Sequence, residues 1–223
     1  MELRNVTVIG DGAMATACAM ILDSRGYSVT VWGPFEDHVA DLERHRENRR
    51  YMPNIPLPAS LMFTADVSVA MAQPDLIVSA APTQFVRRTW QRFADKTPAG
   101  VPIVSVAKGI ENDTLLRPSQ VIADVLADDQ PRPIGALSGP SIAGELARCL
   151  PATVCIACED LALAGELQLA FTTRWFRVYT NDDLLGVELA GATKNVIALA
   201  AGILDGLQAG YNAKSALLSR GLA

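Results

Sequence analysis

The sequence predicts a doubly wound α/β fold, in which a mostly parallel sheet of the Rossmann type precedes the start of an all-helical second domain. A β-branched run at residues 6–9 is followed by a glycine turn and a helix. Short apolar runs then alternate with helical segments as far as residue 179. From Leu184 to Leu204 nearly every residue is apolar or small. We therefore expect a domain boundary near Asp182, between residues 1–181 and 182–223.

The glycine turn at residues 10–15 is the feature around which the chain is organised. Gly10, Gly12 and Ala15 have the spacing G-x-G-x-x-G/A between a strand and a helix. Gly10 allows a tight turn, Gly12 lets a pyrophosphate approach the backbone, and Ala15 lets helix and strand pack closely. The helix begins at Ala13, and the free N–H groups of its first residues, Ala13 and Met14, attract an anion. The motif predicts a dinucleotide-binding domain over residues 1–181; the alternative is an ordinary tight βα turn.

The second strand, Ser28–Trp32, does not indicate which dinucleotide is preferred. In many NAD enzymes this strand ends in an acidic residue that binds the ribose 2′-hydroxyl. Here Trp32 is followed by Gly33 and Pro34, and the first carboxylate is Glu36. The choice between NAD and NADP therefore stays open.

The remaining elements continue the alternation. We expect further strands at 61–64, 76–80, 102–106, 134–137, 153–157 and 176–179, helices at 36–46, 67–72, 84–96, 118–126 and 161–171, a helix ending at 147, and a polar loop at 46–58. Ligands bind at the carboxyl ends of parallel strands, so the loop containing Pro82 should border the nicotinamide side of the site.

Composition limits the class of protein. The chain has 223 residues, is 50% hydrophobic, and carries a net charge of −5 without a basic block, which argues against a nucleic-acid surface. The N-terminal residues do not form a signal-peptide pattern, so a cytoplasmic protein is expected. Cys155 and Cys158 have the spacing of a metal or redox pair. No second pair completes a site, so we expect packing cysteines and no metal.

The apolar segment from Leu184 to Leu204 predicts a long helix. Such a helix either crosses a membrane or is buried in a helical domain. Glu188, Lys194 and Asn195 lie within it together with several glycines. Polar residues of this kind are costly in a bilayer, so we expect burial in protein and no membrane span.

Two lysines are candidates for chemistry. The helical neighbours of Lys194 are small or apolar, and no carboxylate lies three or four positions away. Such a lysine is expected to be partly desolvated, which suits a general acid/base. The alternative is a lysine that extends to water or pairs with a distant carboxylate. Lys108 follows a predicted strand and precedes a glycine, so it either holds a phosphate or hydroxyl or is an ordinary loop lysine.

Several motifs, in their order along the chain, are similar to those of one known family. They are Val-Ile-Gly-Asp-Gly-Ala-Met-Ala-Thr-Ala (8–17), Val-Trp-Gly (31–33), Ala-Lys-Gly-Ile-Glu (107–111), Leu-Ser-Gly-Pro-Ser-Ile-Ala-Gly-Glu-Leu-Ala (137–147), Phe-Arg-Val-Tyr (176–179), Gly-Val-Glu-Leu-Ala-Gly-Ala-Thr-Lys-Asn-Val-Ile-Ala (186–198) and the segment 212–223. Together they resemble the NAD(P)-dependent glycerol-3-phosphate dehydrogenases, over the whole chain.

The resemblance implies an oxidoreductase that interconverts dihydroxyacetone phosphate and sn-glycerol 3-phosphate with NAD or NADP and feeds glycerophospholipid synthesis. Lys194 would be the catalytic proton donor and acceptor at the C2 oxygen. The implied substrate-binding residues are Lys108, Gly139, Ser141, Lys194 and Asn195. The implied cofactor-binding residues are Gly10, Gly12, Ala13, Met14, Ala15, Trp32, Pro82, Lys108 and Ala143. The partner would be a small phosphorylated triose.

The sequence also departs from the family pattern. Ala15 replaces the third glycine, and Pro34 stands where bacterial members often have a polar residue. Family members continue with helices that carry an aspartate near the reacting centre and an Arg-Asn pair for the phosphate. We therefore expect an incomplete helical substrate domain over 182–223, with exposed apolar helices that favour a homo-oligomer. Two alternatives are a non-catalytic dinucleotide-binding protein and a related hydroxyacid dehydrogenase.

Overall fold

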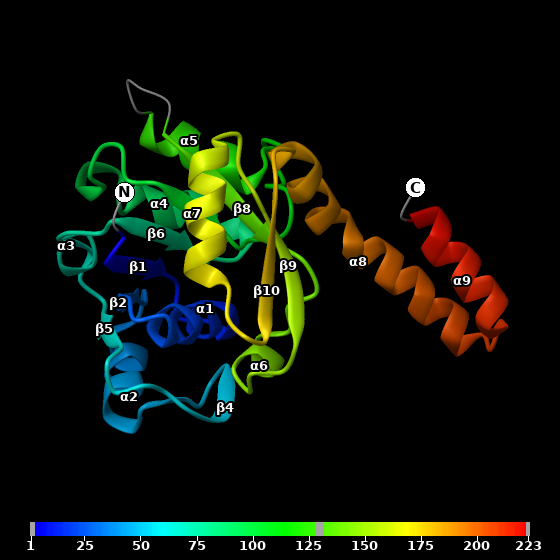
Figure 1. Cartoon of the computed structure of the whole chain (residues 1–223), viewed down its shortest axis with the longest axis horizontal. Coiled ribbons are helices and arrows are strands. Elements are labelled where there is room, and N and C mark those ends of the chain that lie inside the picture. Colours follow the sequence, from blue (N-terminus) through cyan, green and yellow to red (C-terminus); the bar gives the residue numbers. More distant parts are fainter. Residues whose placement is uncertain (1–2, 128–131, 222–223) are drawn as a thin grey trace.

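An eight-stranded sheet forms the centre of the computed structural model, which describes residues 3–127 and 132–221 (Figure 1). The strand order is β10-β9-β8-β7-β6-β1-β2-β5. Every neighbouring pair is parallel except β8 and β9. The chain runs outward from β1 to β5 and then returns to the other side of β1 as β6, so the predicted doubly wound, mostly parallel sheet is confirmed.

Most observed elements lie close to their predicted positions. The sheet strands are β1 (Asn5–Ile9), β2 (Ser28–Trp32), β5 (Met62–Thr64), β6 (Leu76–Ser79), β7 (Ile103–Ser105), β8 (Ile134–Ser138), β9 (Ala152–Ala157) and β10 (Phe176–Asn181). The helices are α1 (Ala13–Ser24), α2 (Glu36–His45), α3 (Val67–Ala70), α4 (Val86–Gln91), α5 (Pro118–Leu126), α6 (Ala143–Leu146), α7 (Leu161–Phe171), α8 (Leu184–Gly206) and α9 (Gly210–Gly221).

Each face of the sheet has its own apolar core. Helices α1 and α7 pack on one face, where the core includes Val8, Leu22 and Phe171. Helices α4 and α5 contact each other over the other face, where Trp90 and Phe93 are fully buried. The cysteines Cys18 and Cys158 are buried among these residues, in agreement with the packing role expected for Cys158, whereas Cys155 is half-buried. The two helical layers hold the sheet between them, and the carboxyl ends of its parallel strands carry the candidate site.

Two sequence predictions were wrong in detail. Residues 46–58, predicted as a loop, contain the antiparallel pair β3 (Glu47–Asn48) and β4 (Met52–Pro56). The predicted helix at 84–96 is divided into the 3₁₀ turn η1 (Thr83–Phe85), α4 and the 3₁₀ turn η2 (Ala94–Lys96). The division follows from hydrogen bonds to carbonyls three residues back, such as Phe93 N to Trp90 O, which tighten the helix as Phe93 turns into the core.

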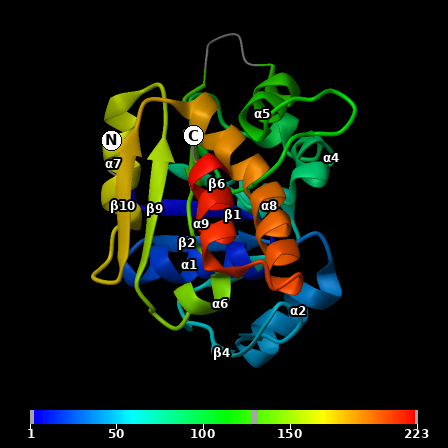
Figure 2. The ribbon, with the colours of Figure 1, turned by 90° about the vertical axis from the view of Figure 1, so that its right-hand side faces the viewer.

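Helix α8 leaves the sheet as a long arm, and α9 folds back along it (Figures 1 and 2). Its buried residues in the described chain are Leu184, Glu188 and Gly191. The predicted burial of the whole helix is therefore wrong beyond its first two turns. Leu199 is 70% exposed and Ile203 62%, so the expected exposure of apolar side chains is confirmed. By length and composition α8 is the one described helix that could cross a bilayer, which is weak evidence, and the absence of a membrane span stays a prediction.

Candidate functional site

The glycine turn connects β1 to α1 with its backbone open to the cavity. Gly10 has φ +123°, and a Cβ there would lie 3.0 Å from the Ala80 carbonyl oxygen, so only glycine fits without strain. A Cβ on Gly12, the N-cap of α1, would meet nothing within 4 Å. As a glycine, Gly12 supplies no side-chain hydrogen bond to this end of α1. The first turn of α1 thus offers N–H groups to a ligand beside free space, which fits a pyrophosphate.

A buried asparagine from β3 holds this turn in place. Asn48 is completely buried, and its Nδ2 donates to the Asp11 carbonyl oxygen and to Thr16 Oγ1, both at 2.8 Å. Thr16 Oγ1 in turn donates to the Gly12 carbonyl oxygen at 3.0 Å. Sequence reasoning missed this role, because Asn48 lies among charged residues with no periodic signal for burial.

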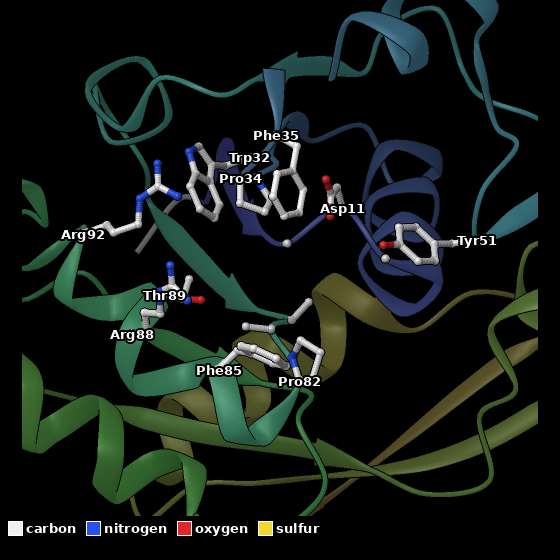
Figure 3. A pocket seen from close by; sticks show the side chains of 14 residues that line it. Asp11, Trp32, Pro34, Phe35, Tyr51, Pro82, Phe85, Arg88, Thr89 and Arg92 are labelled. Atoms are coloured by element: carbon white, nitrogen blue, oxygen red, sulfur yellow. The ribbon is translucent and has the colours of Figure 1, made fainter. Parts of the chain in front are cut away.

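A cavity of about 710 Å³ opens above the turn (Figure 3). It is lined by Gly10, Asp11, Gly12, Trp32, Pro34, Phe35, Tyr51, Ala80, Ala81, Pro82, Phe85, Arg88, Thr89 and Arg92. Four predicted cofactor residues are therefore brought together: Gly10, Gly12, Trp32 and Pro82. Sequence reasoning missed the other aromatic side chains and the two arginines, because they come from the loop after β2, the β3–β4 hairpin and the segment from η1 to the end of α4.

The other predicted cofactor residues do not line this cavity. Ala13 is the first residue of α1, and Ala15 is 1% exposed against the core. Met14 and Ala143 are partly buried and pack on the same core cluster. Lys108 lines a second cavity farther along the sheet edge. Their roles at a cofactor stay predictions.

A buried acid and a histidine lie next to the turn. Asp11 Oδ2 and His38 Nε2 are 3.9 Å apart, and both are buried atoms without a hydrogen-bond partner among the described residues. Burial raises the pKa of the Asp11 carboxyl, and the nearby charges of His38 and Arg50 only partly oppose this. Burial thus makes ionisation of this carboxyl less favourable than it would be in water.

The second cavity, of about 470 Å³, lies at the carboxyl ends of β7 and β8. Lys108, Gly139, Ser141 and Lys194 line it, so four of the predicted substrate residues lie together. Lys108 Nζ donates to the Gly139 carbonyl oxygen at 2.9 Å and to Ser141 Oγ at 3.2 Å. Burial lowers the pKa of Lys108, and the positive charge of Lys194 lowers it further against the opposing effect of Cys18. The two hydrogen bonds hold the ammonium group of Lys108 in position at the site.

Lys194 does not have the environment predicted for it. Its side chain is exposed, and Nζ donates to Asn195 Oδ1 at 2.9 Å. The expectation of a desolvated lysine is therefore wrong for this structure, because the distal part of α8 is not covered by protein. Lys194 nevertheless lines the same cavity as Lys108, at the carboxyl ends of the strands. Asn195 is exposed and does not line this cavity.

The first turns of α8 bring Lys194 to this cavity. Glu188 accepts hydrogen bonds from Ser119 N at 2.9 Å and Ser119 Oγ at 2.6 Å, and it pairs with Arg117 at 2.5 Å. A Cβ on Gly191 would lie 2.9 Å from Ser138 Oγ and 3.6 Å from Lys108 Cγ. The ion pair of Glu188 with Arg117 and the close approach of Gly191 to Ser138 together place α8 against β8. The sequence did not identify Arg117 and Ser119 as partners of Glu188, because they lie about seventy residues away.

The two cavities both lie at the carboxyl ends of the strands, and they differ in the chemical groups that line them. The first combines open backbone N–H groups, aromatic side chains and two arginines, which suits a nucleotide with a pyrophosphate. The second presents two lysines and a serine to a small anionic or hydroxyl-bearing molecule. Among the described residues, no group of three or more His, Cys, Asp or Glu side chains could hold a metal ion.

Comparison with known proteins agrees with this architecture. The sequence profile of the NAD-dependent glycerol-3-phosphate dehydrogenase N-terminus matches residues 5–164, and the profile of the C-terminus of the same family matches residues 183–223. A glycerol-3-phosphate dehydrogenase [NAD(P)+] of Bacillus pumilus is 43% identical over 99% of this chain and 64% of the relative. One of Prosthecochloris aestuarii is 43% identical over 98% of this chain and 66% of the relative.

A solved structure shows the same fold. The crystal structure of glycerol-3-phosphate dehydrogenase from Coxiella burnetii superimposes with a TM-score of 0.89 and 34% identity, over 99% of this chain and 66% of that one. The chain thus spans 64% to 66% of the length of these relatives. The matched profiles, the identity over nearly all of this chain and the shared fold establish that it belongs to the NAD-dependent glycerol-3-phosphate dehydrogenase family.

Proposed function

We propose that this chain is part of an oxidoreductase that interconverts dihydroxyacetone phosphate and sn-glycerol 3-phosphate with NAD or NADP. The observation that carries the proposal is the meeting of Lys108 and Lys194 in one cavity, beside the open glycine turn on the same sheet edge. Reduction of a carbonyl needs a hydride donor at the reacting carbon and a proton donor at its oxygen, and the reverse reaction needs the corresponding acceptors. The two cavities at the carboxyl ends of the strands supply one place for each.

The residues of the second cavity account for the proton and for orientation. Reduction of the C2 carbonyl adds a hydride to carbon, which the reduced nicotinamide supplies when bound, and a proton to oxygen. The Lys194 ammonium group would donate that proton and take it back in the reverse reaction. Lys108, held by Gly139 and Ser141, would bind the oxygen atoms of the substrate. Asn195, which accepts a hydrogen bond from Lys194, would orient the ammonium group.

The exposure of Lys194 limits how it could act. An exposed ammonium group loses little of its hydration, so a bound substrate and cofactor would have to exclude water from it. The role of Lys194 is therefore tied to occupation of both cavities. Its neighbour Lys108 is already partly buried, and it would fix the substrate first.

The test is an assay of NADH and NADPH oxidation with dihydroxyacetone phosphate as substrate. We expect Lys194→Ala to lower turnover by about 10²- to 10⁴-fold, the contribution typical of a general acid, and to leave cofactor affinity unchanged. The matched control is Lys214→Ala, which removes an α9 ammonium group that pairs with Asp205 away from both cavities. Unchanged turnover in Lys194→Ala would refute the assigned role.

Two other functions are distinguished by the same assay. A non-catalytic dinucleotide-binding protein would bind NADH or NADPH without oxidising either, and the open glycine turn supports this reading as well. A hydroxyacid dehydrogenase would prefer a non-phosphorylated carbonyl acid in a substrate panel. The two lysines favour the phosphorylated triose, because they offer two cations to a dianion.

The cellular setting proposed for this activity follows from its product. Glycerol 3-phosphate is a building block of glycerophospholipids, so the reaction would feed their synthesis in the cytoplasm. The exposed apolar side chains of α8 support a homo-oligomer. Fractionation of cells and sedimentation of the purified chain test these two points.

A further inference from the structure

We infer that this chain selects a dinucleotide with a 2′-phosphate, NADP(H), and that Arg92 and Arg88 on the α4 side of the first cavity read that phosphate. The inference rests on the proposed function only in assuming that the cavity above the glycine turn binds a dinucleotide. Selectivity between the two cofactors is decided where the adenosine ribose meets the end of the second strand. The residues around that point are therefore the relevant ones.

The loop after β2 has no acidic side chain to hold a 2′-hydroxyl. Trp32, Gly33 and Pro34 end the strand, and Gly33 is closely packed, since a Cβ there would lie 2.5 Å from Asp11 Oδ2. Glu36 and Asp37 are the next carboxylates, but they lie exposed in the first turn of α2 and do not line the cavity. The usual signal for NAD is absent from this part of the described chain.

The carboxylate that does line the cavity is poorly placed to replace it. Asp11 Oδ2 is a buried atom that faces His38 Nε2 at 3.9 Å. The same oxygen packs against Gly33, where a Cβ would lie 2.5 Å away, so it is enclosed by protein and not open to a ligand hydroxyl. We therefore do not assign Asp11 to the ribose.

Two arginines face the end of β2 from the opposite wall. Arg88 and Arg92 are four residues apart, on one side of α4 and its C-terminal residue, and both line the cavity (Figure 3). Neither forms an ion pair with a carboxylate of the described residues, whereas their neighbour Arg87 is bound to Glu111 and Asp124. The two guanidinium groups are thus available to an anion.

Arg92 is held in position by the last residue of β2. Its guanidinium carbon lies 4.8 Å from the centre of the Trp32 ring, as expected for a cation–π contact. Trp32 is 2% exposed, donates from Nε1 to the Ala65 carbonyl oxygen at 3.0 Å, and packs edge-on against Phe93. A fixed aromatic platform therefore holds a planar cation at the end of the second strand. This preorganisation lowers the cost of binding a phosphate.

The charges of the two candidate ligands differ at this one point. A 2′-phosphate carries close to two negative charges at neutral pH and can accept paired hydrogen bonds from a guanidinium group. A 2′-hydroxyl is neutral and gains little from two arginines. The cavity wall formed by α4 thus distinguishes the two cofactors through charge, without any acidic residue on β2.

The test compares ligands that differ only in the 2′-phosphate. Adenosine 2′,5′-bisphosphate and 5′-AMP form one pair, and NADPH and NADH form the other; binding is measured by isothermal titration calorimetry without substrate. We expect the phosphorylated member of each pair to bind about tenfold or more tightly. Arg92→Ala should weaken its binding by about 10- to 100-fold, the effect typical of a lost charged hydrogen bond, and change 5′-AMP binding little.

Three further variants sharpen the result. Arg92→Lys keeps the charge but loses the planar fork, so it should retain part of the preference. Lys96→Ala is the matched control, because it removes an exposed cation four residues away that does not line the cavity. Pro34→Asp places a carboxylate at the end of β2 and should shift the preference toward NADH.

The outcomes separate this inference from the proposed function. Equal affinity for both members of each pair, or an equal loss for both in Arg92→Ala, overturns the role of the arginines while dinucleotide binding stands. Tighter binding of NADH in the wild-type chain overturns it as well. If neither NADH nor NADPH binds, the proposed function itself fails.

Discussion

Helices α1 and α8 are both rich in small and apolar residues, but α1 is largely buried and α8 is largely exposed. Helix α1 buries most of its residues between positions 15 and 22 against the sheet, α6 and α7. Helix α8 buries Leu184, Glu188 and Gly191, and its later residues Leu199 and Ile203 are largely exposed. Composition therefore indicates that a helix can be buried, whereas neighbouring elements decide whether it is.

The contrast extends to how each helix holds its part of the site. The turn before α1 is fixed by glycine backbone geometry and by the buried Asn48. The start of α8 is fixed by a buried carboxylate and by one close glycine contact. The cofactor side of the site is thus built into the core, while Lys194 depends on a few polar contacts at one end of a helix.

The largest effect is expected at the ionic attachment of α8. Glu188→Ala would leave Arg117 and the Ser119 N–H group without their buried partner. Breaking such a pair should lower the free energy of unfolding by about 3 kcal/mol. Urea denaturation measures the loss, and faster hydrogen exchange of α8 amides should accompany it.

The control for this prediction is Glu188→Gln, which keeps the size of the side chain and one of its acceptor atoms. We expect it to lose clearly less stability than Glu188→Ala. A loss below about 1 kcal/mol in the alanine variant, at the low end for an unsatisfied buried group, would show that α8 is not anchored through this carboxylate.

The same contrast explains how much the sequence could predict. The strands and α1 were predicted well because their apolar periodicity and the glycine spacing reflect local burial and backbone geometry. The contacts of Asn48 and Glu188 could not be predicted, because each joins residues distant in the chain and polar side chains carry no burial signal. Arg92 was missed for the same reason: its contact with Trp32 exists only once α4 packs beside β2.

The exposure of Lys194 shows where local reasoning fails. Its small and apolar neighbours along the helix suggested a desolvated amine. Desolvation requires another element to cover that face, and in the described residues α9 packs on α8 without burying Lys194. A sequence window reports which residues share a helix face but does not report what covers it.

An intermediate effect is expected from a matched pair of glycines on α8. At Gly191 a Cβ would lie 2.9 Å from Ser138 Oγ, whereas at Gly202 it would meet nothing within 4 Å. Alanine favours the helix by up to about 1 kcal/mol at both positions, but only Gly191→Ala must also displace the packed helix. Gly191→Ala should therefore be less stable than Gly202→Ala by about 1–2 kcal/mol, as measured by thermal unfolding.

Activity sharpens the glycine comparison. A shift of α8 at residue 191 would move Lys194 relative to Lys108, so turnover should fall in Gly191→Ala and stay unchanged in Gly202→Ala. Equal stability and equal turnover in the two variants would mean that close approach at Gly191 does not set the geometry of the second cavity.

The smallest effect on folding, and the most direct test of the exposed surface, is expected on the outer part of α8. Leu199 and Ile203 lie four residues apart on one helix face and contribute little to the core, so replacing both by Glu should change the free energy of unfolding by only about 0.5 kcal/mol. If this face drives self-association, sedimentation over a range of concentrations should show oligomers for the wild-type chain and monomers for the double variant. Leu169→Glu on α7, where the side chain is 68% exposed, is the control and should leave the association unchanged. A wild-type chain that stays monomeric at every concentration would contradict the prediction, because an apolar face of this extent would then remain in water without a partner.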